Sequence, residues 1–265
     1  MKNVHMLFMD ESFAYDLTKK KENIKFGSLT GIMVPVNLVT NLLEDIYAIL
    51  KLALKSRIEP NVIDLKLFDN LLHGSNFMPS YDDNVKEYVL NNLMNIINKN
   101  KIFIIRVCYL VTDNNKKFYY NLLGHQPKNQ ILSTCWAGMN SLLQEFLKKN
   151  IVIPVIEDEI ESKQQKSIFS GMIKSSHQIL HIDYNSCSLP QNKNFFEVLY
   201  SKKDYSYLTG LVDCISYCLL QRQECKGNEI NASIYKKICI EAANKISPSL
   251  VIEEIIDMEF QDKKH

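Results

Sequence analysis

The sequence lacks the features that mark a membrane-bound, exported or strongly polyanion-binding protein. No apolar run approaches the roughly 20 residues needed to cross a bilayer, and the apolar stretch at residues 4–9 is too short for a signal peptide. The 31 basic and 30 acidic residues give a formal net charge of +1, so no overall positive field favours nucleic acid. We therefore expect a cytoplasmic protein without a membrane partner, in which any nucleic-acid binding is local.

The cysteines form neither a disulfide framework nor a zinc ribbon. They number seven, an odd count, and include no Cys-x-x-Cys pair. Cys214 and Cys218 lie one helical turn apart, but two thiols alone do not complete a tetrahedral zinc site. The sequence also lacks a Gly-rich phosphate loop and an internal repeat. We expect reduced and mostly packed cysteines.

The composition is that of a chain that folds by itself. Apolar residues make up 46% and charged residues 23%, close to the globular average. A length of 265 residues fits one core domain with an appendage, which we place at residues 1–225 and at a helical extension, residues 226–265, packed on the core. Short lysine runs at 19–21, 116–117 and 202–203 are typical of solvated loops, although they could also bind a polyanion locally.

The order of the predicted elements indicates an α/β protein. Apolar strands at 4–9 and 24–36 form a hairpin, and they precede strands alternating with helices. The later strands are expected at 102–111, 151–156 and 180–184, with 251–260 as a last strand or a docking tail. The helices are expected at 37–56, 83–98, 129–149, 162–176, 205–222 and 231–245. This order predicts a mixed sheet, with an N-terminal antiparallel hairpin and later parallel strands, flanked by helices. Pro154 indicates an edge or bulged position for its strand.

Three carboxylates occur where the chain is otherwise apolar. Asp10 follows the strand HMLFM, Asp158 follows IVIPVIE, and Asp213 lies within YLTGLVDCISYCLL. For Asp158, a turn or a helix cap is a sufficient structural explanation. Asp213 is the only charged residue from 205 to 221, in a helix that is apolar on nearly every side and should be buried. A buried carboxylate needs a hydrogen-bond donor, a counter-charge or a metal; the alternative is a modestly exposed face beside Gly210, whose small size leaves space for a substrate.

Two further acids are candidates for the same site. Glu11 follows Asp10, but neighbouring side chains of a regular strand point to opposite faces, so both bind one ion only if the strand has turned. Asp64 and Lys66 share a face in the segment IDLKLF, where they supply an acid and a base to one surface or simply form an ion pair.

These residues together resemble a family, the bacterial domain of unknown function 3800, whose members have ribonuclease-H-like folds. The resemblance rests on four motifs in the expected order: Asp10-Glu11-Ser12, Asp64-Leu65-Lys66, Asp158 and Val212-Asp213. The first and last motifs are the more specific. Phe13 stands where a glycine is common and Val212 replaces the usual alanine, which is typical of a divergent member and would narrow or close the site.

The resemblance implies a ribonuclease-H-like fold and a divalent-metal-dependent nuclease. Clustered carboxylates are natural ligands for Mg²⁺ or Mn²⁺, and two ions would activate water for phosphodiester hydrolysis of RNA or DNA. Asp10 would bridge both ions, Asp158 and Asp213 would complete one each, and Asp64 or Glu11 would be the fourth carboxylate. Lys66 would hold the scissile phosphate, His73 would orient water or the leaving group, and Ser12 would contact substrate.

Two alternatives remain open at this point. In the first, the fold persists but Phe13 and Val212 close the site, and the protein is an inactive interaction module that acts through a protein partner such as a toxin, antitoxin or phage component. In the second, the same metals serve a phosphohydrolase of free nucleotides, which the missing phosphate loop disfavours.

Overall fold

The structure is a computed structural model, and it describes residues 2–15, 24–54, 72, 82–111, 127–157, 199–201 and 207–256. The described strands are β1 (Asn3–Tyr15), β2 (Ile24–Pro35), β3 (Phe103–Leu110), β4 (Asn150–Glu157), β5 (Leu199–Ser201) and β6 (Val251–Ile256). The described helices are α1 (Val39–Leu54), α3 (Asp83–Lys99), α5 (Pro127–Lys149), α7 (Tyr207–Glu224) and α8 (Ile234–Lys245). Short 3-10 helices are η1 (Val36–Leu38), η4 (Glu229–Asn231) and η5 (Pro248–Leu250).

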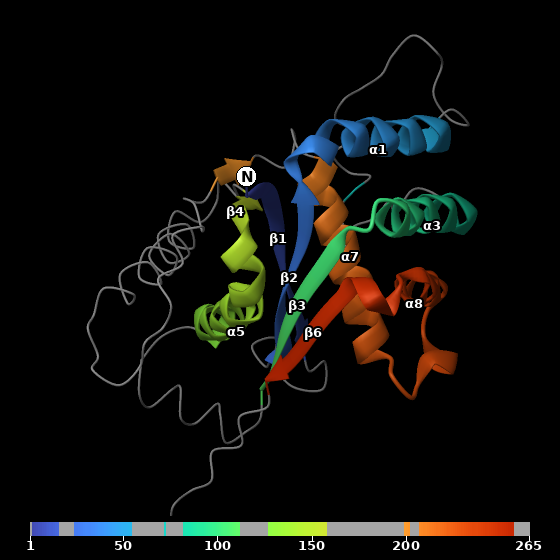
Figure 1. Cartoon of the computed structure of the whole chain (residues 1–265). Helices are drawn as coiled ribbons and strands as arrows, with labels where there is room; N and C mark the ends of the chain where they lie inside the picture. The colour runs from blue at the N-terminus through green and yellow to red at the C-terminus, as the bar shows by residue number, and fades with distance from the viewer. Residues whose placement is uncertain are drawn as a thin grey trace, which may run out of the picture.

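The strands form one mixed sheet in the order β5-β4-β1-β2-β3-β6 (Figure 1). The two N-terminal strands, β1 and β2, pair antiparallel as a hairpin, and β3 pairs antiparallel to β2. The other pairs are parallel: β4 with β1, β5 with β4 and β6 with β3. The predicted α/β class, with a mixed sheet flanked by helices, is confirmed.

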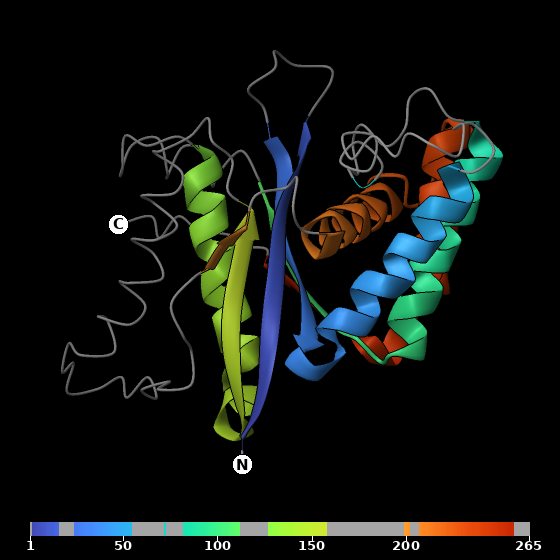
Figure 2. The ribbon, with the colours of Figure 1, turned by 90° about the horizontal axis from the view of Figure 1, so that it is seen from above.

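Helices cover both faces of the sheet, and Figure 2 shows α5 on one side and α7, α1, α3 and α8 on the other. Both faces of the sheet are buried because apolar residues occur at odd and at even positions along the strands. On the α5 side, Leu7 and Met9 of β1 pack with Trp136 and Met139 of α5 in one core. On the α7 side, Phe8 of β1 belongs to a second core with residues of α1, α3, α7 and α8. We call these two surfaces of the sheet the α5 face and the α7 face.

Two strand predictions differ from the structure. β1 does not end at Met9 but continues to Tyr15, because its pairing with β2 runs on through Asp10. Pro154 is not on an edge strand, since β4 lies between β1 and β5. The pairing of β4 with β5 begins at Val155, so among the described residues Pro154 has a ladder neighbour on the β1 side only. A residue without an N–H is tolerated at such a position.

The described helices begin and end within three residues of their predicted bounds. α8 starts later than predicted because Ser233 caps it: the Ser233 hydroxyl accepts a hydrogen bond from the Lys236 N–H, and η4 occupies the preceding turn. The predicted helix 162–176, the predicted strand 180–184, the segment IDLKLF and the three lysine runs lie outside the described residues.

The chain after residue 225 contributes to the sheet as well as to its helical cover. α8 packs against α3 and α7, and Asn98 of α3 joins the end of α8 through its amide, which donates to the Lys245 carbonyl at 2.8 Å and accepts from the Ser247 N–H at 2.9 Å. β6 then pairs with β3, so the segment that we expected as strand or tail is a strand through Ile256.

Candidate functional site between β1 and α7

Asp10 lies on the α7 face of β1, at the point where β1 and β4 part. Side chains alternate between the two faces along a strand, so Phe8 and Ala14 share the face of Asp10. Both pack in cores that contain residues of α7. The parallel pairing of β1 with β4 ends at Met9 and Ile156, one residue before Asp10. The backbone end of β4 is therefore adjacent to Asp10, although Asp10 itself is in the middle of β1.

Asp213 lies on the stripe of α7 that faces the sheet. Ser216 of α7 hydrogen bonds to Ser12 of β1, Leu220 packs with Ala14 of β1, and Gln223 accepts a hydrogen bond from Cys108 of β3. Positions 213, 216, 220 and 223 are spaced by three and four residues, so they share one face of the helix. Asp213 is 9% exposed, and the prediction of a buried helix is confirmed, whereas the modestly exposed face is wrong.

The contacts of α7 place Asp213 level with Asp10. Moving along α7 from Ser216 to Leu220 corresponds to moving along β1 from Ser12 to Ala14, so the two elements run in the same direction. We measure from the contact between Ser216 and Ser12 toward the N-terminal end of each element. With standard rises of 1.5 and 3.3 Å per residue, Asp213 is then about 4.5 Å away along the helix and Asp10 about 6.6 Å away along the strand. The two acids therefore occupy facing surfaces at nearly the same height.

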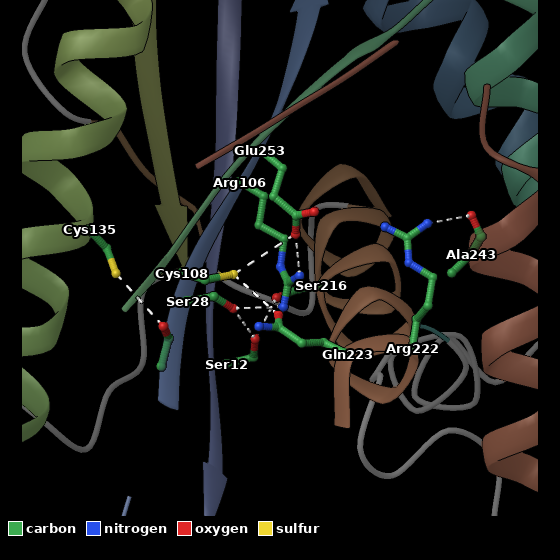
Figure 3. Close-up of polar contacts among 11 residues, drawn as sticks. Ser12, Ser28, Arg106, Cys108, Cys135, Ser216, Arg222, Gln223, Ala243 and Glu253 are labelled. Atoms are coloured by element: carbon green, nitrogen blue, oxygen red, sulfur yellow. Dashed lines mark hydrogen bonds and ion pairs between the residues drawn. The ribbon is translucent and has the colours of Figure 1, made fainter. Parts of the chain in front are cut away.

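Hydrogen bonds between serine hydroxyl groups join β1 and α7 (Figure 3). The Ser216 hydroxyl donates to Ser12 Oγ at 3.2 Å, and the Ser12 and Ser28 hydroxyls are hydrogen bonded at 2.8 Å. Arg106 Nη2 donates to Ser28 Oγ at 3.5 Å, and Arg106 Nη1 forms an ion pair with Glu253 Oε1 at 2.6 Å. We call Ser216, Ser12, Ser28, Arg106 and Glu253 the polar network.

The register of the sheet places Asp10 in one polar row. Asp10 is opposite Thr30, Thr30 is opposite Arg106, and Arg106 is opposite Glu253, so the row crosses β1, β2, β3 and β6 on the α7 face. Thr30 and Arg106 are 0% and 1% exposed. Thr30 Oγ1 and Arg106 Nε have no hydrogen-bond partner within the described part of the chain. This layer therefore contains buried polar atoms whose hydrogen bonds the described residues do not supply.

The thiol beside this row is neutral at physiological pH. Cys108 follows Arg106 on the same face of β3, and burial raises its pKa to about 11, although the Arg106 charge acts in the opposite direction. Cys108 is therefore a hydrogen-bond donor to Gln223 rather than a thiolate ligand.

Glu11 and Ser12 lie on opposite faces of β1, and only Ser12 is on the face of Asp10. β1 has not turned at Asp10, so Glu11 lies opposite Leu29 on the α5 face and does not share a surface with Asp10. Ser12 does share that surface, and its hydroxyl is hydrogen bonded to Ser28 and Ser216. Asp158, Asp64, Lys66 and His73 lie outside the described residues.

The residues that we expected to narrow or open the site have other contacts. Phe13 lies on the α5 face, packs with the core under α5 and has the Lys128 ammonium 5.2 Å from its ring centroid, so it does not close the α7 face. Val212 is fully buried in the core on the α7 side. The space beside Gly210 is filled by Leu72, which is itself buried, and is therefore not left for a substrate.

Sequence reasoning missed the polar network, although part of its signal was visible. Arg106 is the only charged residue of the strand FIIRVCYL, and Ser28 and Thr30 alternate with apolar residues in β2. These residues are polar at positions whose neighbours are buried, which is the criterion that singled out Asp213. The partner Glu253 gave no such signal, because it lies in a short C-terminal strand.

The described residues alone do not form a complete metal site. Within them, no group of three His, Cys, Asp or Glu side chains is arranged to hold a metal ion. The predicted set of Asp10, Asp158 and Asp213 includes one member outside the described ranges. The chemistry of the remaining donors fits a hard divalent ion, because two carboxylates lie on facing surfaces at one height.

Comparison of the chain with protein-family models, with curated proteins and with solved structures found no match. No described helix combines the length and the apolar character that a membrane crossing requires.

Proposed function

We propose that this chain is a divalent-metal-dependent nuclease with a ribonuclease-H-like fold, a divergent member of the domain of unknown function 3800 family. Its metal would be Mg²⁺ or Mn²⁺, its substrate RNA or DNA, and its location the cytoplasm. The antiparallel N-terminal hairpin followed by parallel β4 and β5 supports the fold. The observation that carries the activity is a buried carboxylate, Asp213, on the stripe of α7 that faces the sheet at the height of Asp10.

Asp10 and Asp213 would hold the ion in this proposal, with Asp158 as the third carboxylate. Asp158 directly follows Glu157, where β4 ends beside the Asp10 segment of β1. When bound, the metal would supply an activated water and stabilise the charge on the departing oxygen. The protein's own task is to hold two like charges close together, which costs free energy until a cation compensates them. Asp64, Lys66 and His73 stay proposed as the fourth acid, the phosphate ligand and a water-orienting group.

Two asparagine variants and one matched control test the proposal. Asp10→Asn and Asp213→Asn keep the shape of the side chain but remove its charge, so each should abolish Mg²⁺- or Mn²⁺-dependent cleavage. Glu11→Gln makes the same chemical change one residue from Asp10, on the opposite face of β1, and should cleave like the parent. Full cleavage by either asparagine variant would remove that residue from the site.

An inactive interaction module is the second candidate. It is favoured by Leu72, which fills the space beside Gly210, and by the hydroxyl groups of Ser12, Ser28 and Ser216, which bond to one another. The parent protein distinguishes the two candidates. No cleavage of RNA, single-stranded DNA or duplex DNA with either metal would favour the interaction module.

A further inference from the structure

We propose that Arg106 is a positioning residue of the proposed metal site formed by Asp10 and Asp213. Through Ser28, Ser12 and Ser216 it sets the position of α7, which carries Asp213, against β1, which carries Asp10. The inference deepens the proposed function and rests on it for the role of the two acids. The contacts themselves belong to the polar network and do not depend on it.

Arg106 is a fixed anchor. Its side chain is 1% exposed, and its Nη1 donates to Glu253 Oε1 at 2.6 Å. The guanidinium is planar, so the ion pair with Glu253 also fixes the direction in which Nη2 points, which is toward Ser28. The position of the guanidinium is therefore set by two strands, β3 and β6, that carry neither acid.

The serine contacts carry this position to the two acids. Serine has a single side-chain torsion, so a hydrogen bond between two serines restricts their backbones directly. Ser12 is two residues from Asp10 on the same face of β1, and Ser216 is one helical turn from Asp213 on the same face of α7. A shift at the contact between Ser12 and Ser216 would therefore change the separation of Asp10 and Asp213.

The affinity for a metal ion depends on the separation of the two acids, whereas the stability of the fold depends on many other contacts as well. Mg²⁺ demands near-ideal octahedral geometry, and ligand distances tolerate only about 0.2 Å. A buried ion pair is by itself weak evidence for a role in stability, because apolar residues of the same volume serve as well or better. Control of the separation between Asp10 and Asp213 explains why an arginine and three serines occupy the layer of the two acids.

The first test uses no metal. Arg106→Lys keeps a positive charge for Glu253 but loses the fork that reaches Ser28, and Ser216→Ala removes the contact with Ser12. Urea unfolding of the parent, both single variants and the double variant in EDTA gives a double-mutant cycle. Each variant changes the unfolding equilibrium constant by some factor relative to the parent. We expect the factor of the double variant to differ about threefold or more from the product of the two single factors, which is the usual size of coupling within one network. Independent effects would overturn the inference.

The second test measures the dissociation constant of Mn²⁺ by electron paramagnetic resonance or calorimetry. Arg106→Lys should weaken Mn²⁺ binding about tenfold, the low end of what groups behind the ligands contribute. Val107→Ala is the control: Val107 is fully buried on the other face of β3, so this variant loses stability without touching the network. Ser216→Thr keeps the hydroxyl and should bind Mn²⁺ more tightly than Ser216→Ala.

The outcomes separate the two proposals. Parent protein that binds no Mn²⁺ overturns the metal centre, while the coupling measured in EDTA still decides whether Arg106 positions α7. Parent protein that binds Mn²⁺ with the same affinity as Arg106→Lys overturns the positioning role and leaves the proposed nuclease intact. An equal loss of affinity in Val107→Ala and Arg106→Lys would show a general effect of stability and would also overturn the positioning role.

Discussion

Gly210 of α7 lies directly against Leu72. A Cβ atom added at Gly210 would stand 3.0 Å from the carbonyl oxygen of Leu72 and closer still to its Cβ. Leu72 is 3% exposed and belongs to the core on the α7 face. The glycine therefore permits close packing of a neighbouring segment on α7, the helix that carries Asp213.

Gly210→Ala should destabilise the protein, although alanine is the better helix former. The added methyl group meets backbone as well as side chain, so the cost is that of overpacking, about 1–3 kcal/mol. Urea unfolding measures it. In a Leu72→Gly background the same substitution should cost less, because the nearest clashing atom, the Leu72 Cβ, is absent. An equal cost in both backgrounds would show that the Leu72 side chain is not the obstacle.

Asp213→Asn should raise the melting temperature in EDTA and remove most of the stabilisation by Mg²⁺. Facing carboxylates repel each other without a metal, so a neutral amide relieves the apo protein. For the parent, free Mg²⁺ at tenfold its dissociation constant should contribute about 1.4 kcal/mol of stability. Thermal melts of parent and variant in EDTA and in excess Mg²⁺ measure both effects. A variant that melts lower, with an unchanged response to Mg²⁺, would show that Asp213 is a structural aspartate.

Glu253→Gln should destabilise the protein by about 3 kcal/mol, because it leaves the buried Arg106 guanidinium without its counter-charge. We expect the low end of the range for broken buried pairs, since the Glu253 side chain is 29% exposed. Glu254→Gln is the matched control: it is the next residue of β6 and points to the other face of the sheet, so its effect should stay within about 0.5 kcal/mol. Equal effects would contradict the importance of the ion pair.

Stability should fall above pH 9 because two thiols ionise less readily in the folded protein. Burial raises the pKa of Cys108 from 9.0 to about 11 and that of Cys135 from 9.0 to about 12. The unfolded chain loses these protons first, so the stability present below pH 9 is lost as the pH rises, by up to about 1.4 kcal/mol per thiol and pH unit. Urea unfolding between pH 8 and 10.5 measures the slope, and Cys135→Ser should have a smaller one. Identical slopes would contradict the burial effect.

The main architecture was predictable from local sequence pattern. The hairpin, the helices and their approximate bounds follow from apolar periodicity, and alternation along β1 already assigned Asp10 and Glu11 to opposite faces. The burial of Asp213 followed from the apolar residues on all sides of its helix. These features depend on residues close together in the chain, and they were therefore readable without a structure.

The features that the sequence did not predict depend on distant pairing. β1 continues to Tyr15 because β2 supplies partners, and three-residue β5 is too short to show a period. Arg106 and Glu253 are 147 residues apart, and Ser12 and Ser216 are 204 residues apart. No local pattern specifies such pairs, so the network behind the two acids emerged only from the register of the sheet.

The pairing of β6 with β3 also bears on how the chain matures during synthesis. Glu253, the counter-charge of Arg106, lies 147 residues further along the chain, so β3 is synthesised well before the strand that completes the ion pair. Until then the arginine has no ion-pair partner in β6 and disfavours a closed core. A nascent chain that stops before β6 would leave β3 as the edge of the sheet and Arg106 without Glu253, and incompletely paired strands of this kind are prone to aggregation. One strand, β6, thus supplies both a ladder partner for β3 and the counter-charge that allows Arg106 to be buried.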